Sequence, residues 1–339
     1  MIKKSVVKTF RFILFIIAFV AYLSLIQSCK KSTKEITNEP EVPTTTPTTG
    51  PVTNTCTATK ANIENIDIFP ADNPWRKDIS GNPIDPFSAE IIDGFNGNVI
   101  KADFGSGLWQ NAPIGIPYVA VCGKQTKVPI TFTDYGNESD PGPYPIPLTA
   151  PIEGNGTGDS HAIAVDIENG MLYELFNAHV NGNHWEASSG AIFNLKSNAM
   201  RPEGWTSADA AGLPVFAGLV RYDEIVKGEI DHPIRFTLGS SLVKQAYIYP
   251  AQHKVNSTGG TYSLPFGARI RLKSSFNISG YSATNQIILR AMKKYGLILA
   301  DIGSNLYITG APDERWNNSD LSKLGQIHGS DFEVVKFNN

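Results

Sequence analysis

The sequence lacks the short motifs that mark several large enzyme classes. It has no G-x-S-x-G elbow, no H-E-x-x-H helix, no phosphate-binding glycine loop and no dinucleotide fingerprint. None of its three cysteines has an obvious base near it in the sequence. Covalent serine or cysteine catalysis therefore has no specific support, and we expect neither a cofactor nor a resident metal.

Clusters of basic residues are also absent. The chain has 29 Lys and Arg against 32 Asp and Glu, a net charge of -3, and its cations are scattered. A protein that neutralises nucleic-acid phosphates carries a concentrated basic footprint. We therefore expect no nucleic-acid partner.

The one long uncharged apolar run lies at the N-terminus. Lys3, Lys4, Lys8 and Arg11 precede an apolar stretch over residues 12–26, which is the order of an export signal. Fifteen residues are too few for a comfortable membrane span. A short retained anchor helix is the alternative, but charge, apolar length and the boundary that follows all favour a signal peptide over residues 1–28.

That boundary resembles the lipobox of bacterial lipoproteins. It reads Leu25-Ile26-Gln27-Ser28-Cys29, with an apolar residue three positions before the cysteine and a small residue directly before it. The resemblance implies that Cys29 becomes the first mature residue, receives a diacylglycerol on its sulfur and is acylated, for example with palmitate, on its new N-terminus. Two or more acyl chains anchor a protein stably in a bilayer. The implied location is the bacterial cell envelope, at the outer membrane, on its periplasmic or its cell-surface face.

A polar segment follows the lipidated cysteine. Residues 29–60 are rich in Thr, Pro, Glu, Lys and Asn and contain few aliphatic residues, which is typical of a disordered tether. Such a coil reaches roughly 30 Å. The remaining residues 61–339 contain no second linker-like stretch, so we expect them to form a single globular domain beside the membrane.

Two cysteines remain in the exported part, Cys56 and Cys122. The extracytoplasmic compartment permits oxidation, and a disulfide between them would pin the end of the tether to the domain. Two separate buried thiols are the alternative, since the sequence gives no distance.

The globular part is predicted to be mainly β with one packed helix, as a β-sandwich or a strongly bent antiparallel sheet. Thirty Gly and 22 Pro interrupt short apolar runs, a pattern of short strands and long loops. Asn169-Gly170 between two such runs predicts a tight hairpin with positive φ at both residues. The predicted strands are residues 118–122, 128–133, 162–166, 171–176, 191–195, 234–238, 246–249, 269–272 and 297–301.

One long helix is predicted over residues 283–295. Ile287, Ile288, Ala291, Met292 and Tyr295 recur at helical spacing, and a glycine follows as a cap. Shorter helices are predicted at residues 207–211, 222–226 and 319–324, the first and last of them beginning at serine caps.

The first candidate site residue is His161, in Gly158-Asp159-Ser160-His161. A polar triplet leads there into a buried strand, with Asp159 two residues away on the same face. His161 at a strand mouth suits a general base or a ligand. A half-buried structural histidine beside a turn aspartate is an equal alternative.

The second candidate segment runs over residues 179–190. His179, His184 and Glu186 around an Asn-Gly turn form a conceivable divalent-metal set, although their spacing matches no defined zinc motif. A Trp beside a carboxylate is also what a sugar subsite offers. We interpret Trp185 and Glu186 in that second sense, with Glu186 as a catalytic candidate.

The third candidate segment is rich in carboxylates, from Arg201 through His232. Glycoside hydrolysis requires two carboxyl groups, one as acid and one as base or nucleophile. Asp223 and His232 are catalytic candidates here, and Trp205 and Arg221 are candidate substrate contacts. Ordinary ion pairs on a solvated loop are the alternative for any single carboxylate.

The fourth candidate segment follows the strand predicted at 297–301. Asp301 ends that strand and opens a glycine turn, a position where function often sits. Further along the chain Trp316, beside Asp313 and Arg315, is a fourth candidate substrate contact.

Parts of residues 204–214, 219–224, 228–236 and 291–301 resemble an uncharacterised family of exported, polysaccharide-associated bacterial proteins. Examples are Gly204-Trp205-Thr206-Ser207-Ala208-Asp209 and Leu219-Val220-Arg221-Tyr222-Asp223-Glu224. The resemblance implies export and one continuous fold over the C-terminal two thirds. It transfers no catalytic residue.

Together these patterns predict a membrane-anchored extracytoplasmic protein that acts on polysaccharide as a glycoside hydrolase or lyase. A non-catalytic glycan-binding lipoprotein and a structural envelope lipoprotein are the alternatives, and whether the chain is an enzyme stays open. The expected partners are the bilayer, through acylated Cys29, and a polysaccharide.

Overall fold

The computed structural model describes residue 63 and residues 66–337. All of them belong to one compact unit. The predicted signal peptide, Cys29 and the tether to residue 60 lie outside the described residues, and their boundaries stay predictions.

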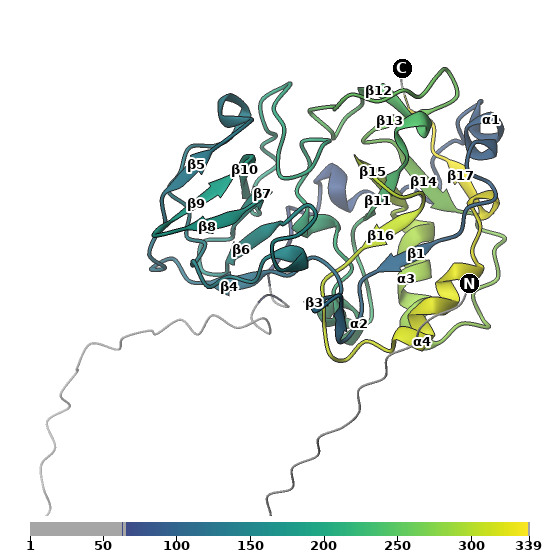
Figure 1. Cartoon of the computed structure of the whole chain (residues 1–339). Coiled ribbons are helices and arrows are strands. Elements are labelled where there is room, and N and C mark those ends of the chain that lie inside the picture. Colours follow the sequence, from purple (N-terminus) through teal and green to yellow (C-terminus); the bar gives the residue numbers. More distant parts are fainter. Residues whose placement is uncertain (1–62, 64–65, 338–339) are drawn as a thin grey trace, which may run out of the picture. The chain divides into compact units, whose positions relative to one another are not determined.

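The largest sheet has six strands and a mixed pattern (Figure 1). Two of its strand pairs are parallel, β1 with β16 and β11 with β15, and the others are antiparallel. In spatial order the strands are β1 (Lys101–Asp103), β16 (Tyr307–Thr309), β11 (Ile234–Leu238), β15 (Leu297–Ile302), β14 (Arg269–Leu272) and β17 (Phe332–Val334).

Smaller sheets complete the β structure. The four-stranded sheet has the order β10 (Ser189–Asn194), β7 (Met171–Phe176), β6 (Ala162–Asp166) and β4 (Val119–Val121). The three-stranded sheet has the order β5 (Ile130–Phe132), β9 (His184–Ala187) and β8 (His179–Asn181). Two-stranded ribbons join β2 (Leu108–Trp109) to β3 (Ala112–Pro113), and β12 (Val243–Tyr247) to β13 (Leu264–Phe266).

The longest helix among the described residues is α3 (Ala283–Lys294), which contacts β14 (Figure 1). The Ser282 hydroxyl accepts a hydrogen bond from the Asn285 amide at its N-terminus. Gly296 follows its C-terminus with φ of 76°, the left-handed conformation of a glycine cap. The shorter helices are α1 (Ser88–Asp93), α2 (Tyr222–Lys227) and α4 (Asn318–Leu321). The helix predicted over 283–295 is confirmed.

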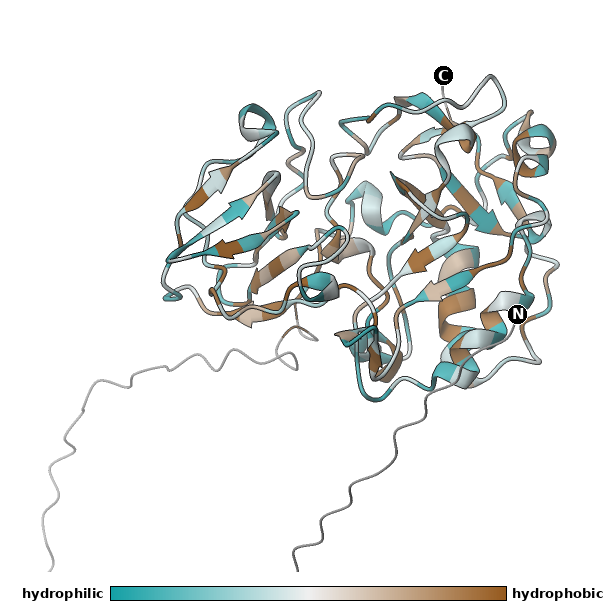
Figure 2. Cartoon of the chain, in the orientation of Figure 1, coloured by the Kyte–Doolittle hydropathy of each residue, from teal (hydrophilic) through white to brown (hydrophobic). Residues whose placement is uncertain are grey.

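Two hydrophobic clusters form the core. The larger one joins residues of α3 to the six-stranded sheet, and Figure 2 shows α3 largely in the apolar colour. The smaller one lies around Tyr144, Leu175 and Trp185, beneath the strands of the two smaller sheets. Burial of this much apolar surface is the main stabilising contribution to such a domain.

The predicted β-rich fold class is confirmed. The strands over 162–166, 171–176, 234–238 and 269–272 have the predicted bounds. The strands that were not predicted are β1, β2, β3, β8, β9, β13, β16 and β17. The helix predicted over 207–211 is wrong, because these residues form bends and turns. The Ser207 hydroxyl there donates to the Leu213 carbonyl at 2.6 Å and accepts from the Asp209 amide, so it fixes a turn and caps no helix.

The predicted hairpin at Asn169-Gly170 is confirmed, but its loop is longer than predicted. Strands β6 and β7 pair antiparallel, with Asp166 opposite Met171, so four residues form the loop. Gly170 has positive φ and Asn169 does not. The Asp166 carboxylate accepts hydrogen bonds from the amides of Glu168 and Asn169, which replaces the two-residue turn chemistry.

Cys122, directly after β4, takes part in a disulfide bond. Its predicted partner Cys56 lies outside the described residues. The pairing therefore stays a prediction. Within residues 66–337, no helix combines the length and the apolar character that crossing a bilayer requires.

Substitutions at Gly296 and Gly228 test how closely the chain after α3 packs against β14. Both have positive φ, but a Cβ on Gly296 would lie 2.5 Å from the Ile270 carbonyl oxygen, whereas one on Gly228 would meet nothing within 4 Å. We expect Gly228→Ala to cost about 1 kcal/mol of unfolding free energy from backbone strain alone. Gly296→Ala should cost roughly 2 kcal/mol more, the typical penalty of overpacking.

Urea denaturation of the two variants beside the wild type measures both losses. Equal losses would contradict the close approach of Gly296 to β14.

Candidate active site

A cavity of about 200 Å³ lies over one face of the six-stranded sheet. Its floor comes from four neighbouring strands. In register, Asp103 of β1 lies opposite Thr309 of β16, and Thr237 of β11 lies opposite both Tyr307 and Asp301. Partner residues on adjacent strands point to the same face of a sheet, so these polar side chains converge.

A β-bulge brings Asp301 to this face. On β11 the consecutive residues Phe236 and Thr237 lie opposite Leu299 and Asp301, so Ala300 is an extra residue in β15. Without it, Asp301 would point to the opposite face from Ile298, because side chains alternate along a strand. The Ala300 carbonyl accepts a hydrogen bond from the Ala211 amide, which fixes the bulge. Bulges commonly re-aim a side chain next to a functional site.

The opposite wall comes from the start of β6 and the segment before it. Glu153, in the 3-10 turn Glu153–Asn155, lines the cavity together with Asp159 and His161. Ser160 between them is 1% exposed and has φ of 51°, a strained conformation for a residue other than glycine. The amides of Asn177 and Ala178 bond to the carbonyls of Asp159 and Ser160 and hold this conformation. Such strain often accompanies functional sites.

Arg235 on β11 is the central charge of the cavity. Its Nε and Nη2 atoms donate to the two carboxylate oxygens of Asp209 at 2.7 and 3.0 Å. Nη2 also donates to Oδ2 of Asp301 at 3.3 Å. Both partners of the Arg235–Asp209 pair are almost fully buried, so their mutual neutralisation is required for folding.

Asp301 is the carboxyl group of the cavity with the most altered acidity. Its burial and the nearby negative charge of Asp209 raise its pKa to about 7, although Arg235 acts in the opposite direction. Asp301 therefore keeps its proton to a higher pH than an ordinary aspartate does. A carboxylic acid that keeps its proton near pH 7 is suited to general acid catalysis.

His161 and Glu153 form an ion pair on the opposite wall. Nδ1 of His161 lies 2.5 Å from Oε2 of Glu153, and Nε2 lies 2.8 Å from the Ala208 carbonyl oxygen. Burial alone would lower the pKa of His161, but the Glu153 carboxylate outweighs it and raises that pKa to about 9. The pKa of Glu153 is lowered despite its own burial, because of the His161 charge. Both ring nitrogens therefore donate, and His161 cannot act as the general base that the sequence suggested.

Two further polar groups line the cavity floor, the carboxyl group of Asp103 and the hydroxyl group of Thr309. Burial, with the Glu153 charge, raises the pKa of Asp103. The Thr309 hydroxyl is buried and has no hydrogen-bond partner within the described part of the chain. A buried polar atom without a partner is uncommon in folded proteins, and a ligand in the cavity would satisfy it.

Of the five predicted catalytic residues, the structure brings only His161 and Asp301 together in this cavity. Asp223 and His232 lie instead in a buried cluster around α2, with Arg221 and Glu224. The space beside this cluster is only about 20 Å³. A substrate cannot enter it.

The α2 cluster is a structural network. Arg221 donates to Glu224 at 2.7 Å, and His232 lies 2.8 Å from both the Glu224 carboxylate and the Pro233 carbonyl oxygen. The Arg221 guanidinium also packs over the Phe216 ring at 4.8 Å. Asp223 and Glu224 both pair with the buried Arg221 and neutralise its charge. Neither carboxylate is therefore available for the cleavage of carbohydrate that we expected of this segment. Asp223, His232 and Arg221 are therefore corrected to structural positions.

Glu186 and Trp185 lie on β9, in the three-stranded sheet, and neither lines the cavity. Trp185 is 0% exposed, and its indole N–H donates to the Ile146 carbonyl. It cannot present a ring to a sugar. Glu186 accepts a hydrogen bond from the Asn181 amide and lies 3.8 Å from His184. Among residue 63 and residues 66–337, no group of three His, Cys, Asp or Glu side chains is arranged to hold a metal ion.

The other two predicted tryptophans also pack against protein. Trp316 is 3% exposed, donates to the Ala311 carbonyl and contacts the rings of Phe104 and Tyr222. Trp205 is half-buried, with the guanidinium of Arg201 5.8 Å from its ring centre. Neither lines the cavity.

An exposed tryptophan that the sequence analysis missed is Trp109, on the β2–β3 ribbon. It is 70% exposed, beside the 66% exposed Leu108. The side-chain amide of Asn155 donates to the Asn111 carbonyl at 2.7 Å and fastens this ribbon to the turn that carries Glu153. An exposed aromatic face therefore belongs to the same local unit as one wall of the cavity.

No family model, no curated protein and no solved structure matches this chain. The resemblance to an exported, polysaccharide-associated family therefore stays a prediction. The function must be argued from the geometry of the cavity.

The His161–Glu153 pair predicts a specific pH dependence of stability. The folded-state pKa of His161 is above the ordinary histidine value of 6.5. The charged His161 therefore contributes its full share to the free energy of unfolding below about pH 6.5, and this share is lost as the pH rises through 9. We expect wild type to lose about 3 kcal/mol over this window, and His161→Gln to lack this loss.

Thermal unfolding between pH 6 and 9.5 measures the difference. The exposed His179→Gln variant serves as the control and should follow wild type. Parallel curves for wild type and His161→Gln would show that His161 is not charged in the folded protein.

Proposed function

We propose that this protein is an exported, lipid-anchored enzyme that hydrolyses glycosidic bonds of a polysaccharide in the cavity between Asp301 and Glu153. The observation that carries the proposal is that four carboxyl groups from three separate segments of the chain line one cavity. They are Asp103, Glu153, Asp159 and Asp301. Like charges disfavour such an approach, so their convergence suggests a chemical purpose.

The two opposite walls differ in acidity, as glycoside hydrolysis requires. Asp301, with its pKa near 7, is the proton donor to the leaving-group oxygen. Glu153, with its lowered pKa, is the ionised partner that activates water or attacks the sugar. After proton transfer, Arg235 stabilises the new Asp301 carboxylate at 3.3 Å.

His161 is a positioning residue in this scheme. It holds Glu153 through Nδ1 and is itself held by the Ala208 carbonyl through Nε2. A lyase would need an unprotonated base to remove a proton from the sugar ring. His161 carries its proton to high pH and cannot be that base, so the pair supports hydrolysis better than an elimination that depends on this histidine.

Trp109 supports a carbohydrate as the substrate class. Sugar rings stack on exposed aromatic faces, and this one belongs to the ribbon fastened to the Glu153 turn. The same feature also favours non-catalytic glycan binding as the second candidate function, because binding needs only the aromatic platform and polar groups.

We infer the location from the N-terminus. The export signal and Cys29 would anchor the domain at the outer membrane, and the residues up to 60 would separate it from the bilayer. In this arrangement the enzyme acts on polysaccharide beside the membrane.

The full chain, in detergent, incubated with a panel of neutral and acidic polysaccharides tests the activity. We expect new reducing ends from wild type and a loss of at least ~1000-fold in Asp301→Asn, since the amide cannot donate the proton. Glu186→Gln is the matched control. It removes a carboxylate of the three-stranded sheet, outside the cavity, and should retain activity.

Affinity gels that contain the same polysaccharides distinguish the second candidate. Retention of both wild type and Asp301→Asn on a gel, with no reducing ends from either, would replace hydrolysis by glycan binding. Activity that survives in Asp301→Asn but not in Glu186→Gln would place the chemistry elsewhere.

The pH profile of hydrolysis distinguishes the assigned roles. Because Asp301 must be protonated, we expect activity to fall about tenfold per pH unit above pH 7. The pKa of Glu153 is lowered, so the acid limb should lie below pH 4.5. Initial rates between pH 3.5 and 9 measure both limbs. Activity that rises above pH 7 would contradict a proton-donating Asp301 and would indicate base-catalysed elimination.

A further inference from the structure

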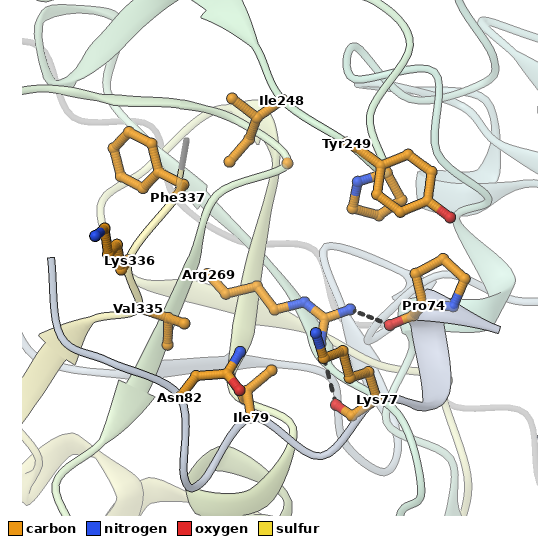
Figure 3. A pocket seen from close by; sticks show the side chains of 12 residues that line it. Pro74, Lys77, Ile79, Asn82, Ile248, Tyr249, Arg269, Val335, Lys336 and Phe337 are labelled. Atoms are coloured by element: carbon orange, nitrogen blue, oxygen red, sulfur yellow. Dashed lines mark hydrogen bonds between the residues drawn. The ribbon is translucent and has the colours of Figure 1, made fainter. Parts of the chain in front are cut away.

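A second cavity, of about 350 Å³, shares no lining residue with the first. Its walls come from the chain before α1, the turn after β12, the start of β14 and the segment after β17 (Figure 3). The lining residues are Pro74, Lys77, Ile79, Asn82, Ile248, Tyr249, Pro250, Gly267, Arg269, Val335, Lys336 and Phe337.

The charges of this cavity are all of one sign. Arg269, Lys77 and Lys336 line it, and none of the lining residues is acidic. The chain as a whole has a net charge of -3, so three cations without an acid depart from its general composition. The cavity therefore favours an anion.

Arg269 differs from the other buried arginines. Arg201, Arg221, Arg235 and Arg271 each have a carboxylate within 4.0 Å. Arg269 is 9% exposed, yet within the described residues it has no carboxylate at that distance and bonds only to the carbonyls of Pro74 and Lys77. Burial lowers its pKa to about 10, so it remains charged at neutral pH. A buried charge without a counterion is costly to fold.

The guanidinium retains donors for a ligand. Arginine has five N–H donors, and the bonds to Pro74 at 2.6 Å and Lys77 at 3.4 Å use two of them. Figure 3 shows the guanidinium between these two residues, with Tyr249 and Phe337 on opposite sides of the cavity. A planar fork of this kind matches the two oxygens of a carboxylate.

Apart from Asn82, most of the remaining lining is apolar. Ile79, Ile248, Pro250, Val335 and Phe337 contribute hydrocarbon surface, with the ring of Tyr249 at the rim. The volume is at the lower end of the range for small-molecule sites and accommodates a single ring. We propose that this cavity binds an organic carboxylate with a ring-sized apolar body, whose carboxylate pairs with Arg269 and whose ring packs between Ile248 and Phe337.

Benzoate is a suitable probe, with benzamide as its neutral match and inorganic phosphate as an anion without an apolar body. Isothermal titration of the full chain in detergent should show saturable binding of benzoate. We expect benzamide and phosphate each to bind at least ~10-fold more weakly, because one lacks the charge and the other lacks the ring.

Arg269→Gln should weaken benzoate binding by roughly tenfold or more, since a charged hydrogen-bonding partner is lost. Lys77→Gln with Lys336→Gln replaces two exposed residues, so it tests the site without altering the buried structure, and it should weaken binding several-fold. Arg290→Gln, an exposed arginine on α3 outside the cavity, is the control and should bind like wild type.

Equal binding of benzoate and benzamide would overturn the anionic specificity, and phosphate that binds as tightly as benzoate would overturn the apolar part. Benzoate binding that persists in both the Arg269 and the double-lysine variants would remove the site from this cavity. Because Asp301 lies in the other cavity, Asp301→Asn should bind benzoate normally, so this test is independent of the hydrolysis assay.

Discussion

The buried guanidinium of Arg235 is the interaction on which the arrangement of the large sheet and its cavity depends. It stands in the centre of the sheet, pairs with Asp209 from a loop and reaches Asp301 on the adjacent strand. A charge in such a place destabilises the fold strongly unless its partners are held in position. The loop that carries Asp209 is therefore tied to the sheet by an ion pair whose two charges also act, together with burial, on the pKa of Asp301. The same ion pair thus affects both the fold and the protonation of the cavity.

The strands that the sequence predicted best are those with the most regular burial. Residues 162–166 and 234–238 are continuous runs of buried residues, residues 171–176 are buried except at their two ends, and the bounds of all three were predicted without error. Strands β1, β8 and β16 have three residues each, too few for a period to be recognised. The equally short β4 and β5 were located because each lies inside a longer, mostly apolar run of the sequence. The helix predicted over 207–211 failed because Ser207 bonds to a turn instead of capping a helix. In this segment the contacts of the folded chain outweigh the local helix propensity.

The candidate site was predictable only in part. His161 and Asp301 were identified because each adjoins a strand in a polar context, and both line the cavity. Asp103 and Glu153 were missed, since Asp301, which lines the cavity with them, lies 198 and 148 positions away in the sequence. The bulge at Ala300, which aims Asp301, has no sequence signal that alternation would reveal. Trp185 and Trp316 were predicted as substrate contacts, but each buries its ring and donates its indole N–H to a backbone carbonyl. Trp109, which was not predicted, is exposed on a two-residue strand.

The two cavities are linked through one row of the sheet. Ile298 on β15 lies opposite Arg235 of β11 on one side and opposite Arg269 of β14 on the other. Adjacent strands are about 4.8 Å apart, so the backbones of the two arginines are separated by roughly 10 Å. Ile298 is fully buried and apolar between them. Such a side chain does not screen charge, so the two guanidinium groups repel each other across it. Each must therefore be stabilised by its own partners, which are the carboxylates beside Arg235 and the carbonyl oxygens beside Arg269.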